Sequence, residues 1–273
     1  MTIPLEDNVS DILGKAQRGL GVSDSQLAER SGVSVEKIRK LRDGDFDDDA
    51  IGRVAPILKL DAASLRKLAD GKWNPEIIGE VEGLAQFNTT YGDMTVNAYL
   101  VWDPVTREAV AFDTGTDCGG MLERIEKENL SVKLILLTHA HPDHVADLRR
   151  LRKATSAPIY ISELEEAEGA EEVEEGKRFR VGSLEIEARL TSGHSPGGMT
   201  FVVTGLSRPV AIVGDSLFAS SMGGGNVSYD DALRNNREKI LSLPGETIVC
   251  PGHGPLTTVG KEKRDNPFFA MNR

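Results

Sequence analysis

The chain has 273 residues, of which 39% are hydrophobic, so it can bury a substantial core. Its formal net charge of -11 excludes a general electrostatic attraction to nucleic acid along the whole chain. No apolar run approaches the roughly 20 residues that cross a bilayer, and the N-terminus lacks a signal peptide. With only two cysteines, Cys118 and Cys250, the sequence predicts a cytoplasmic protein without a disulfide framework or membrane contact.

The N-terminal part of the chain carries signals for short helices. Ser23 and Gln26 fit a capping box ahead of one helix, and a tight turn at 31–34 leads into a second helix over Val35–Arg42. This arrangement resembles the helix-turn-helix of phage-repressor-like regulators, and the resemblance covers about residues 7–71. The resemblance implies a small all-α domain.

The same resemblance implies a DNA-binding role for the second of these helices. The helix would enter the major groove, with Lys37, Arg39 and Lys40 as its DNA contacts. The nearly balanced charge of the N-terminal part and the run Asp47–Asp49 favour the alternative, a helical module for docking or for homodimerisation. Both interpretations stay open at this point.

Helix signals continue around residues 48–59 and 62–70, and then Gly71 and Pro75 interrupt helix formation. Strand and turn signals alternate beyond this point, which indicates a change of architecture. We therefore expect a helical domain at residues 1–72, a linker at 73–80 and a second domain at 81–273.

A cluster of metal-binding side chains follows a predicted buried strand. The apolar run Val132–Leu137 predicts this strand. The residues after it include four side chains that bind metals well, namely His139, His141, Asp143 and His144. A loop at a strand end can aim such side chains into one cavity. Imidazole nitrogens and carboxylate oxygens suit zinc, and also iron or manganese.

Three further candidates lie in tight turns after predicted strands. His194 follows a predicted strand over Leu184–Leu190, and Asp215 follows the apolar run Val210–Gly214. His253 lies in a glycine-bounded turn after another apolar strand. Because a rigid sheet can position ligands at its strand ends, we expect these three side chains to join the cluster.

The order of these residues, starting with Asp113, resembles the metallo-β-lactamase superfamily over about residues 80–273. The resemblance implies an αβ/βα sandwich of two mixed sheets with helices outside, so we expect an α+β protein. It also implies the ligand sets. One ion would be held by His139, His141 and His194 and the other by Asp143, His144 and His253, with Asp215 bridging both and Asp113 supporting the ligands from behind.

Within the superfamily, the runs Gly214–Phe218 and Pro251–Gly260 are similar to the short glyoxalase II-like thioester hydrolases. The resemblance implies an enzyme with two divalent ions. We expect these to be zinc, with iron or manganese as the alternatives. It would hydrolyse a thioester or related small acyl substrate with a metal-bridging hydroxide as the nucleophile. Asp143 and Asp215 are the expected catalytic carboxylates. The run 219–226 replaces the usual Gly-Arg-x-Asp loop, which leaves glutathione recognition open.

Other functions also fit the sequence. A lactonase or β-lactamase would use the same site, whereas a persulfide dioxygenase would use one iron held by His139, His194 and Asp215. A further alternative is a metal-binding transcriptional regulator whose hydrolase-like domain senses a ligand. Apart from these, Ser162 and Glu165 fit a capping box, and the acidic stretch Glu163–Glu175 is expected to be a solvated helix and loop.

Overall fold

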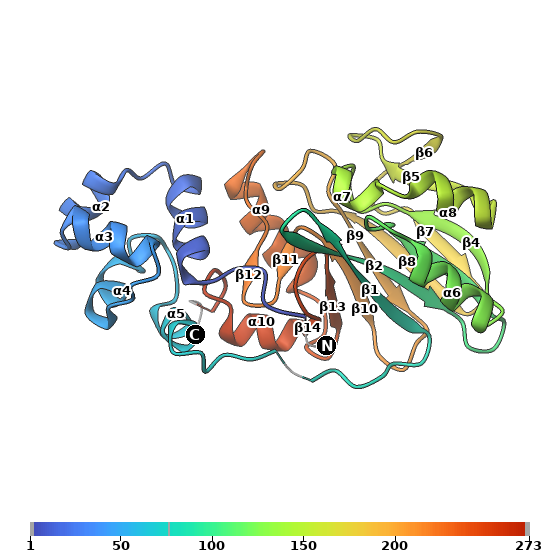
Figure 1. The fold of residues 1–273 in the computed structure, drawn as a ribbon, viewed down its shortest axis with the longest axis horizontal. Helices are drawn as coiled ribbons and strands as arrows, with labels where there is room; N and C mark the ends of the chain where they lie inside the picture. Colours follow the sequence, from blue (N-terminus) through green and yellow to red (C-terminus); the bar gives the residue numbers. More distant parts are fainter. Residues whose placement is uncertain (1–2, 76, 271–273) are drawn as a thin grey trace.

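The computed structural model describes residues 3–75 and 77–270. Its N-terminal part consists of short helices, α1 (Val9–Gly19), α2 (Asp24–Ser31), α3 (Val35–Arg42), α4 (Asp48–Val54) and α5 (Ala62–Ala69) (Figure 1). Before each helix stands a polar residue whose side chain accepts a hydrogen bond from the first turn, which stabilises the helix end. These residues are Asn8, Ser23, Ser34, Asp47 and Asp61. We call α1–α5 the N-terminal unit.

The helices predicted in the N-terminal unit are present, and one of them is shorter than expected. The capping box of Ser23 and Gln26 forms, and α3 has the expected bounds. The helix expected over residues 48–59 ends at Val54, because Pro56 has no backbone N–H with which to continue it. That the unit acts as a helix-turn-helix domain remains a prediction.

Two mixed β-sheets form the larger part of the described chain, with the strand orders β1-β2-β3-β4-β5-β6 and β14-β13-β10-β9-β8-β7. The first sheet contains β1 (Leu84–Tyr91), β2 (Met94–Trp102), β3 (Glu108–Phe112), β4 (Ser131–Leu136), β5 (Ile159–Ser162) and β6 (Ala170–Val173). The second contains β7 (Arg178–Val181), β8 (Leu184–Leu190), β9 (Met199–Thr204), β10 (Val210–Gly214), β13 (Ile248–Pro251) and β14 (Thr257–Thr258). A separate hairpin consists of β11 (Leu217–Phe218) and β12 (Ser221–Met222).

The sheets pack face to face, and helices cover their outer faces (Figure 1). The helices of this part are α6 (Gly119–Lys127), α7 (Pro142–Val145), α8 (Leu148–Thr155), α9 (Tyr229–Asn235), the π-helical turn η1 (Asn236–Ile240) and α10 (Val259–Asp265). Helices α6 and α8 pack on the first sheet, whereas α9, η1 and α10 pack on the second. Between the sheets, the ring centroids of Phe112 and Phe201 lie 5.6 Å apart. This is the expected αβ/βα arrangement.

The strands that lead to the candidate ligands agree with the prediction better than the acidic stretch does. Strands β8 and β10 have the expected bounds, and in β4 Val132, Ile135 and Leu136 are buried while Lys133 is exposed. The helix expected within Glu163–Glu175 is wrong. Residues after Ser162 form a turn, and Ala170–Val173 pairs with β5 as the edge strand β6. Pairing with a neighbouring strand has overridden the local capping signal.

The N-terminal unit shares a hydrophobic core with the second sheet and its helices. Ile12 and Leu13 of α1 belong to the same buried cluster as Tyr229 of α9 and Phe268 beyond α10. The linker expected at 73–80 starts with the buried Trp73, whose ring lies 5.0 Å from the Lys261 ammonium of α10. The N-terminal unit is therefore packed against the sandwich by apolar burial. No helix within the described residues is long and apolar enough to cross a membrane.

An ion-pair cluster also joins the N-terminal unit to α10. The Asp265 carboxylate lies 2.8 Å from Lys67 of α5 and 3.2 Å from Lys261. Burial raises the pKa of Asp265, but hydrogen bonds from Lys67, Lys261 and Arg264 outweigh burial and lower this pKa to about 2. The pKa in the folded state is thus below that of the unfolded chain. The stabilisation is therefore present above about pH 4 and is lost as the pH falls towards 2.

We expect Asp265→Asn to lower the free energy of unfolding at pH 7 by about 1–2 kcal/mol, a modest figure because Lys67 is half-exposed. The variant should also lose less stability than the parent between pH 4 and pH 2. Urea unfolding at a series of pH values measures both effects. Asp70→Asn is the control, because Asp70 pairs with Lys72 at the surface. Equal losses in the two variants would contradict the prediction.

Candidate metal centre

The seven predicted ligands all come from turns or short helices that follow β-strands. His139 and His141 follow β4, and α7 carries Asp143 and His144. His194 follows β8, Asp215 follows β10 and His253 follows β13. Both sheets therefore contribute to one site, and the ligating atoms fall into two groups. The first group is His139, His141, His194 and Asp215, and the second is Asp143, His144 and His253.

The first group has the spacing that a tetrahedral ion requires. His141 Nδ1 lies 2.9 Å from His139 Nε2 and 3.1 Å from His194 Nε2. Asp215 Oδ2 lies 3.4 Å from His194 Nε2. An ion about 2.0–2.1 Å from each nitrogen, with tetrahedral angles, places its ligand atoms about 3.3 Å apart. The observed distances are close to this value, so the group fits a divalent cation.

The second group has a similar spacing and shares Asp215 with the first. Asp143 Oδ2 lies 3.4 Å from His253 Nε2 and 3.6 Å from His144 Nε2. Asp215 Oδ1 is 3.3 Å from His144 Nε2, and Asp215 Oδ2 is 3.3 Å from His253 Nε2. One carboxylate thus faces both groups, which is the position expected of a bridging ligand. That each side chain binds a metal stays a prediction.

Two buried atoms of the centre lack hydrogen-bond partners. Among the described residues, His144 Nε2 and Asp215 Oδ1 are buried without a hydrogen bond, although they lie only 3.3 Å apart. Leaving such atoms unpaired costs free energy unless something else compensates them. A cation bound to both atoms supplies that compensation. The donor set and its unpaired atoms therefore fit the metal that the residue order implies.

Asp113 supports the centre from behind, as expected. Its carboxylate Oδ2 lies 2.8 Å from His144 Nδ1. The same carboxylate accepts hydrogen bonds from the backbone N–H and the hydroxyl of Thr138, both at 2.7 Å. Asp113 has a φ of 56°, a left-handed conformation that is uncommon outside glycine. The backbone after β3 is thus held in an unfavourable conformation that brings this carboxylate to His144.

Other backbone and hydroxyl groups orient the remaining imidazoles. Nδ1 of His194 lies 3.1 Å from the carbonyl of Gly224, and Nδ1 of His253 lies 2.6 Å from the carbonyl of Thr95. When Nδ1 carries the proton and donates to a carbonyl, Nε2 keeps its lone pair for a metal. His194 and His253 therefore present Nε2 to the centre, whereas His141 presents Nδ1.

Carboxylates set the charge of the centre. Burial disfavours a charge on His144 and His253, but Asp215 and its neighbours outweigh burial and raise their pKa values to about 10 and about 11. Burial would raise the pKa of Asp215, yet the two imidazoles hold this pKa well below its usual range. Burial and the nearby His144 lower the pKa of His139 well below its usual value. The second group therefore attracts positive charge.

The sequence analysis missed Glu165 as a part of this site. The Glu165 carboxylate accepts hydrogen bonds from the backbone N–H of Ala140 at 3.3 Å and of Gly197 at 2.9 Å. It thereby joins the loop of His139 and His141 to the loop after His194. In the sequence, Glu165 fits a capping box with Ser162, which indicates the start of a helix and gives no sign of a role at the metal centre.

Asn97 and Tyr99 on β2 were also missed. The Asn97 side chain donates to the carbonyls of Pro251 and Gly254 at 3.0 and 2.8 Å, and the Tyr99 hydroxyl donates to that of Pro251 at 2.7 Å. These bonds fix the turn that carries His253. Both residues lie more than 150 positions from Pro251 in the sequence, so the sequence gives no signal for this contact.

The predicted DNA contacts lie on α3, far from these ligands in the fold (Figure 1). Each of the three side chains has an acidic partner. Lys37 lies 3.0 Å from Asp47, Arg39 lies 3.4 Å from Asp24, and Lys40 lies 3.3 Å from Glu36; these three pairs are at the surface. Such pairs reduce the positive field that phosphate groups would meet. DNA binding by α3 stays a prediction.

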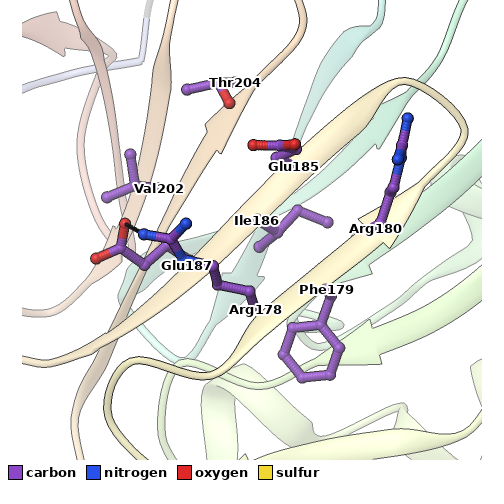
Figure 2. Close-up of a pocket in the computed structure, with 8 residues that line it drawn as sticks. All are labelled: Arg178, Phe179, Arg180, Glu185, Ile186, Glu187, Val202 and Thr204. Atoms are coloured by element: carbon purple, nitrogen blue, oxygen red, sulfur yellow. Dashed lines mark ion pairs between the residues drawn. The ribbon is translucent and has the colours of Figure 1, made fainter.

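A hollow of about 380 Å³ lies on the second sheet, away from the candidate ligands (Figure 2). It is formed by β7, β8 and β9, and its charged side chains alternate in sign. Arg178 and Glu187 form an ion pair across it at 3.7 Å, and Arg180 and Glu185 lie on the neighbouring positions. None of the predicted metal ligands lines this hollow. We therefore assign the chemistry to the histidine-rich centre and not to this surface.

Comparison with known proteins assigns this arrangement to a family. The sequence model of the metallo-beta-lactamase superfamily matches residues 91–253, which is more than half of the chain. The chain belongs to the metallo-beta-lactamase superfamily. The predicted mixed α/β sandwich is thereby confirmed, and the family implies a hydrolase fold with a site for divalent metal.

Relatives of this chain match the metallo-beta-lactamase part. The probable metallo-hydrolase YqgX of Bacillus subtilis is 32% identical over 65% of this chain and 94% of its own length. Hydroxyacylglutathione hydrolase GloC of Haemophilus influenzae is 29% identical over 63% of this chain and 92% of its own. The structure of BLEG-1 B3 metallo-beta-lactamase has a TM-score of 0.58 at 31% identity, covering 67% of this chain and 99% of that one. TTHA1623 in a di-iron-bound form has a TM-score of 0.55 at 31% identity, covering 67% and 100%.

We expect metal binding to release about two protons per chain at pH 7, because the raised pKa values keep His144 and His253 protonated until a cation displaces the protons. Metal affinity should therefore rise with pH through the neutral range and fall as the pH is lowered. Calorimetric titration of metal-free protein with zinc, in buffers of different ionisation enthalpy, counts the protons. No proton release, together with an affinity independent of pH, would contradict this prediction.

Glu165→Gln should speed the release of zinc to a chelator by about tenfold, because an amide cannot accept both backbone hydrogen bonds and the two ligand loops lose their link. The rate of zinc transfer to a chromogenic chelator measures the effect. The exposed neighbour Glu166 provides the matched control, Glu166→Gln, which should release zinc at the parental rate. Identical rates in both variants would show that Glu165 does not position the ligands.

Proposed function

We propose that the chain is a binuclear metal-dependent hydrolase that cleaves the thioester of a small acyl substrate. The observation that carries this proposal is the position of Asp215, whose Oδ2 lies 3.4 Å from His194 of the first group and 3.3 Å from His253 of the second. A pair of ions that shares a carboxylate is suited to activate water between them. A site for a single iron would leave Asp143, His144 and His253 without a role.

The relatives favour thioester hydrolysis within this class. One of them is named a hydroxyacylglutathione hydrolase, and the similarity covers nearly all of its length. The di-iron-bound relative supports a centre of two ions. Nitrogen and carboxylate ligands in this mixture are typical of zinc sites, and we propose zinc as the metal, with iron or manganese as the alternatives.

Asp143 is the residue that we propose to handle the proton of the attacking water. When bound, two divalent ions lower the pKa of a water and polarise the substrate carbonyl. Burial would raise the pKa of Asp143, but a hydrogen bond with His253 and the charge on His144 outweigh burial and lower it. The carboxylate is therefore ionised at neutral pH and can accept a proton. Water then adds to the carbonyl carbon, the carbon–sulfur bond breaks, and this proton passes to the leaving sulfur.

The other residues of the centre hold the reacting groups in place and exclude bulk water. His139, His144 and His253 are at most 2% exposed, so the inner wall of the site is dry. Electrostatic interactions in such a wall are stronger than in water. The ionised Asp215, with its lowered pKa, fixes the positive charges of the site at one point between the two groups.

Apolar side chains at the surface near the ligand loops support an apolar acyl or thiol group in the substrate. Met94 precedes Thr95, whose carbonyl orients His253, and Leu164 precedes Glu165. The backbone N–H of Val227 donates to the carbonyl of Gly193, the neighbour of His194. These three apolar side chains are exposed, and we propose that they contact the substrate.

A substrate panel tests the proposal. Zinc-loaded protein is assayed with S-acylglutathione, coenzyme A thioesters, lactones and a persulfide. We expect the highest kcat/KM with a thioester, and we expect Asp143→Asn to lower kcat by about 10²–10⁴-fold, because the amide cannot accept the proton. Elemental analysis of the purified chain should give two metal ions.

Asp117→Asn is the matched control, because Asp117 is an exposed carboxylate paired with Arg150 outside both ligand groups. It should keep the parental kcat, whereas His139→Ala should abolish turnover of every substrate. Faster turnover of a lactone than of any thioester would overturn the substrate assignment. One iron per chain with oxygen-dependent persulfide turnover would favour a dioxygenase, and turnover unaffected by His139→Ala would overturn the metal mechanism.

A further inference from the structure

The segment 217–225, which contains the β11–β12 hairpin and part of the glycine run, touches two candidate ligands at once. The ring of Phe218 packs edge-on against the ring of His253, with centroids 5.7 Å apart. The carbonyl of Gly224 lies 3.1 Å from His194 Nδ1. A Cβ atom at position 223 would lie only 1.8 Å from the carbonyl oxygen of Asp215, so only glycine fits there. The position of this segment therefore determines how His194 and His253 are oriented.

Helix α1 of the N-terminal unit holds this segment through one lysine. The Lys15 ammonium donates to the carbonyl of Met222 at 2.9 Å and also bonds the carboxylate of Asp7. The Ser221 hydroxyl donates to the same Asp7 oxygen. The Lys15 ammonium also lies 5.1 Å from the ring centroid of Phe218, in cation–π contact. One lysine thus contacts β12 and the ring that packs on His253.

Lys15 and Asp7 form a largely buried ion pair, with side chains 15% and 7% exposed. Burying two charges costs about as much free energy as their attraction returns, so such a pair contributes little net stability. It does fix one geometry, because a shift of the segment would break the hydrogen bond from Lys15 to Met222 and the one from Ser221 to Asp7, and would leave both charges with fewer partners. The pair is therefore better explained by the orientation it imposes on residues 217–225 than by the stability it adds.

Two further contacts join the N-terminal part to the rest of the chain, and one of them reaches a candidate ligand. At the end of α1, a Cβ atom on Gly19 would lie 2.3 Å from the ring of Tyr229, so α1 and α9 approach closely (Figure 1). Before α1, Glu6 packs on Gly254, and Glu6 Oε2 lies 4.0 Å from His253 Nδ1. Glu6 therefore contacts the turn that carries His253, while Asp7 and Lys15 contact the segment 217–225.

We propose that Lys15 and Asp7 are positioning residues of the metal centre. The N-terminal part of the chain would thereby help to fix the geometry of the hydrolase site. Through Met222, Ser221 and Phe218 they fix the segment that orients His194 and His253. The match to the superfamily model begins at residue 91, so this support comes from outside the part of the chain that the model matches. The proposal rests on the metal centre of the proposed function and is independent of the substrate.

The variant Lys15→Met tests the proposal, because it keeps the aliphatic stem and removes the charge and its hydrogen bonds. We expect zinc to pass from this variant to a chelator about tenfold faster than from the parent, as for other losses of support behind a ligand. We also expect the visible absorption bands of the cobalt-substituted variant to shift, since they report ligand geometry. Lys15→Arg should keep the parental spectrum, because a guanidinium can still donate to Asp7 and Met222.

Lys67→Met is the matched control. Lys67 also joins the N-terminal unit to the rest of the chain by an ion pair, but through Asp265 of α10. We expect this control to lower the melting temperature of the metal-free protein less than Lys15→Met does, because Lys67 is half-exposed and Asp265 keeps Lys261, and to leave zinc release and the cobalt spectrum parental. If Lys15→Met is insoluble, the double variant Lys15→Met/Asp7→Asn, which leaves no buried charge unpaired, carries the same expectation.

Two results would overturn the proposal. One is parental zinc release and a parental cobalt spectrum in Lys15→Met or in the double variant. The other is an equal change of both properties in Lys67→Met, which would mean that docking of the N-terminal unit in general, and not the Lys15–Asp7 pair, affects the centre. Neither readout involves a substrate, so a failure of the thioester assignment leaves this test intact.

Discussion

The structure depends on how the free-energy cost of burying several metal-binding side chains close together is offset. Three imidazoles and two carboxylates of the centre are nearly excluded from water, and leaving any of these groups without a partner would cost free energy. Protons compensate part of this, as the raised pKa values of His144 and His253 indicate. A pair of cations compensates it more completely, because Asp215 then faces positive charge on both sides. The site, from which water is largely excluded, is therefore stabilised by positive charge, either from protons on the imidazoles or from cations.

Holding these groups together requires support from all around the site. Both sheets contribute strand ends, and each ligand loop is tied by a group from elsewhere in the chain. Asp113 supports His144 from β3, Asn97 fixes the turn of His253 from β2, and Glu165 joins the two loops around His139 and His194. The geometry of the centre is therefore a property of the whole sandwich together with the first helix.

The part of this description that could be predicted from the sequence is the part that is local. Histidines after apolar runs indicated the ligands, and β8 and β10 were predicted with correct bounds. The acidic stretch was predicted as a helix because its capping signal is local, whereas strand pairing decided its structure. Glu165 and Lys15 could not be identified, since their role depends on chain segments brought together only by folding. A cytoplasmic location, a homodimer and DNA binding remain predictions.

The bond between Lys15 and Met222 spans 207 residues, and that between Asp7 and Ser221 spans 214. During synthesis α1 therefore leaves the ribosome about 200 residues before its partners on β12 are made. Contacts between such distant segments close late in folding. The histidines near residue 140 therefore emerge before His194, Asp215 and His253, the other candidate ligands, have been made. The correct cation is then selected by the complete set of ligands and not by the nascent chain.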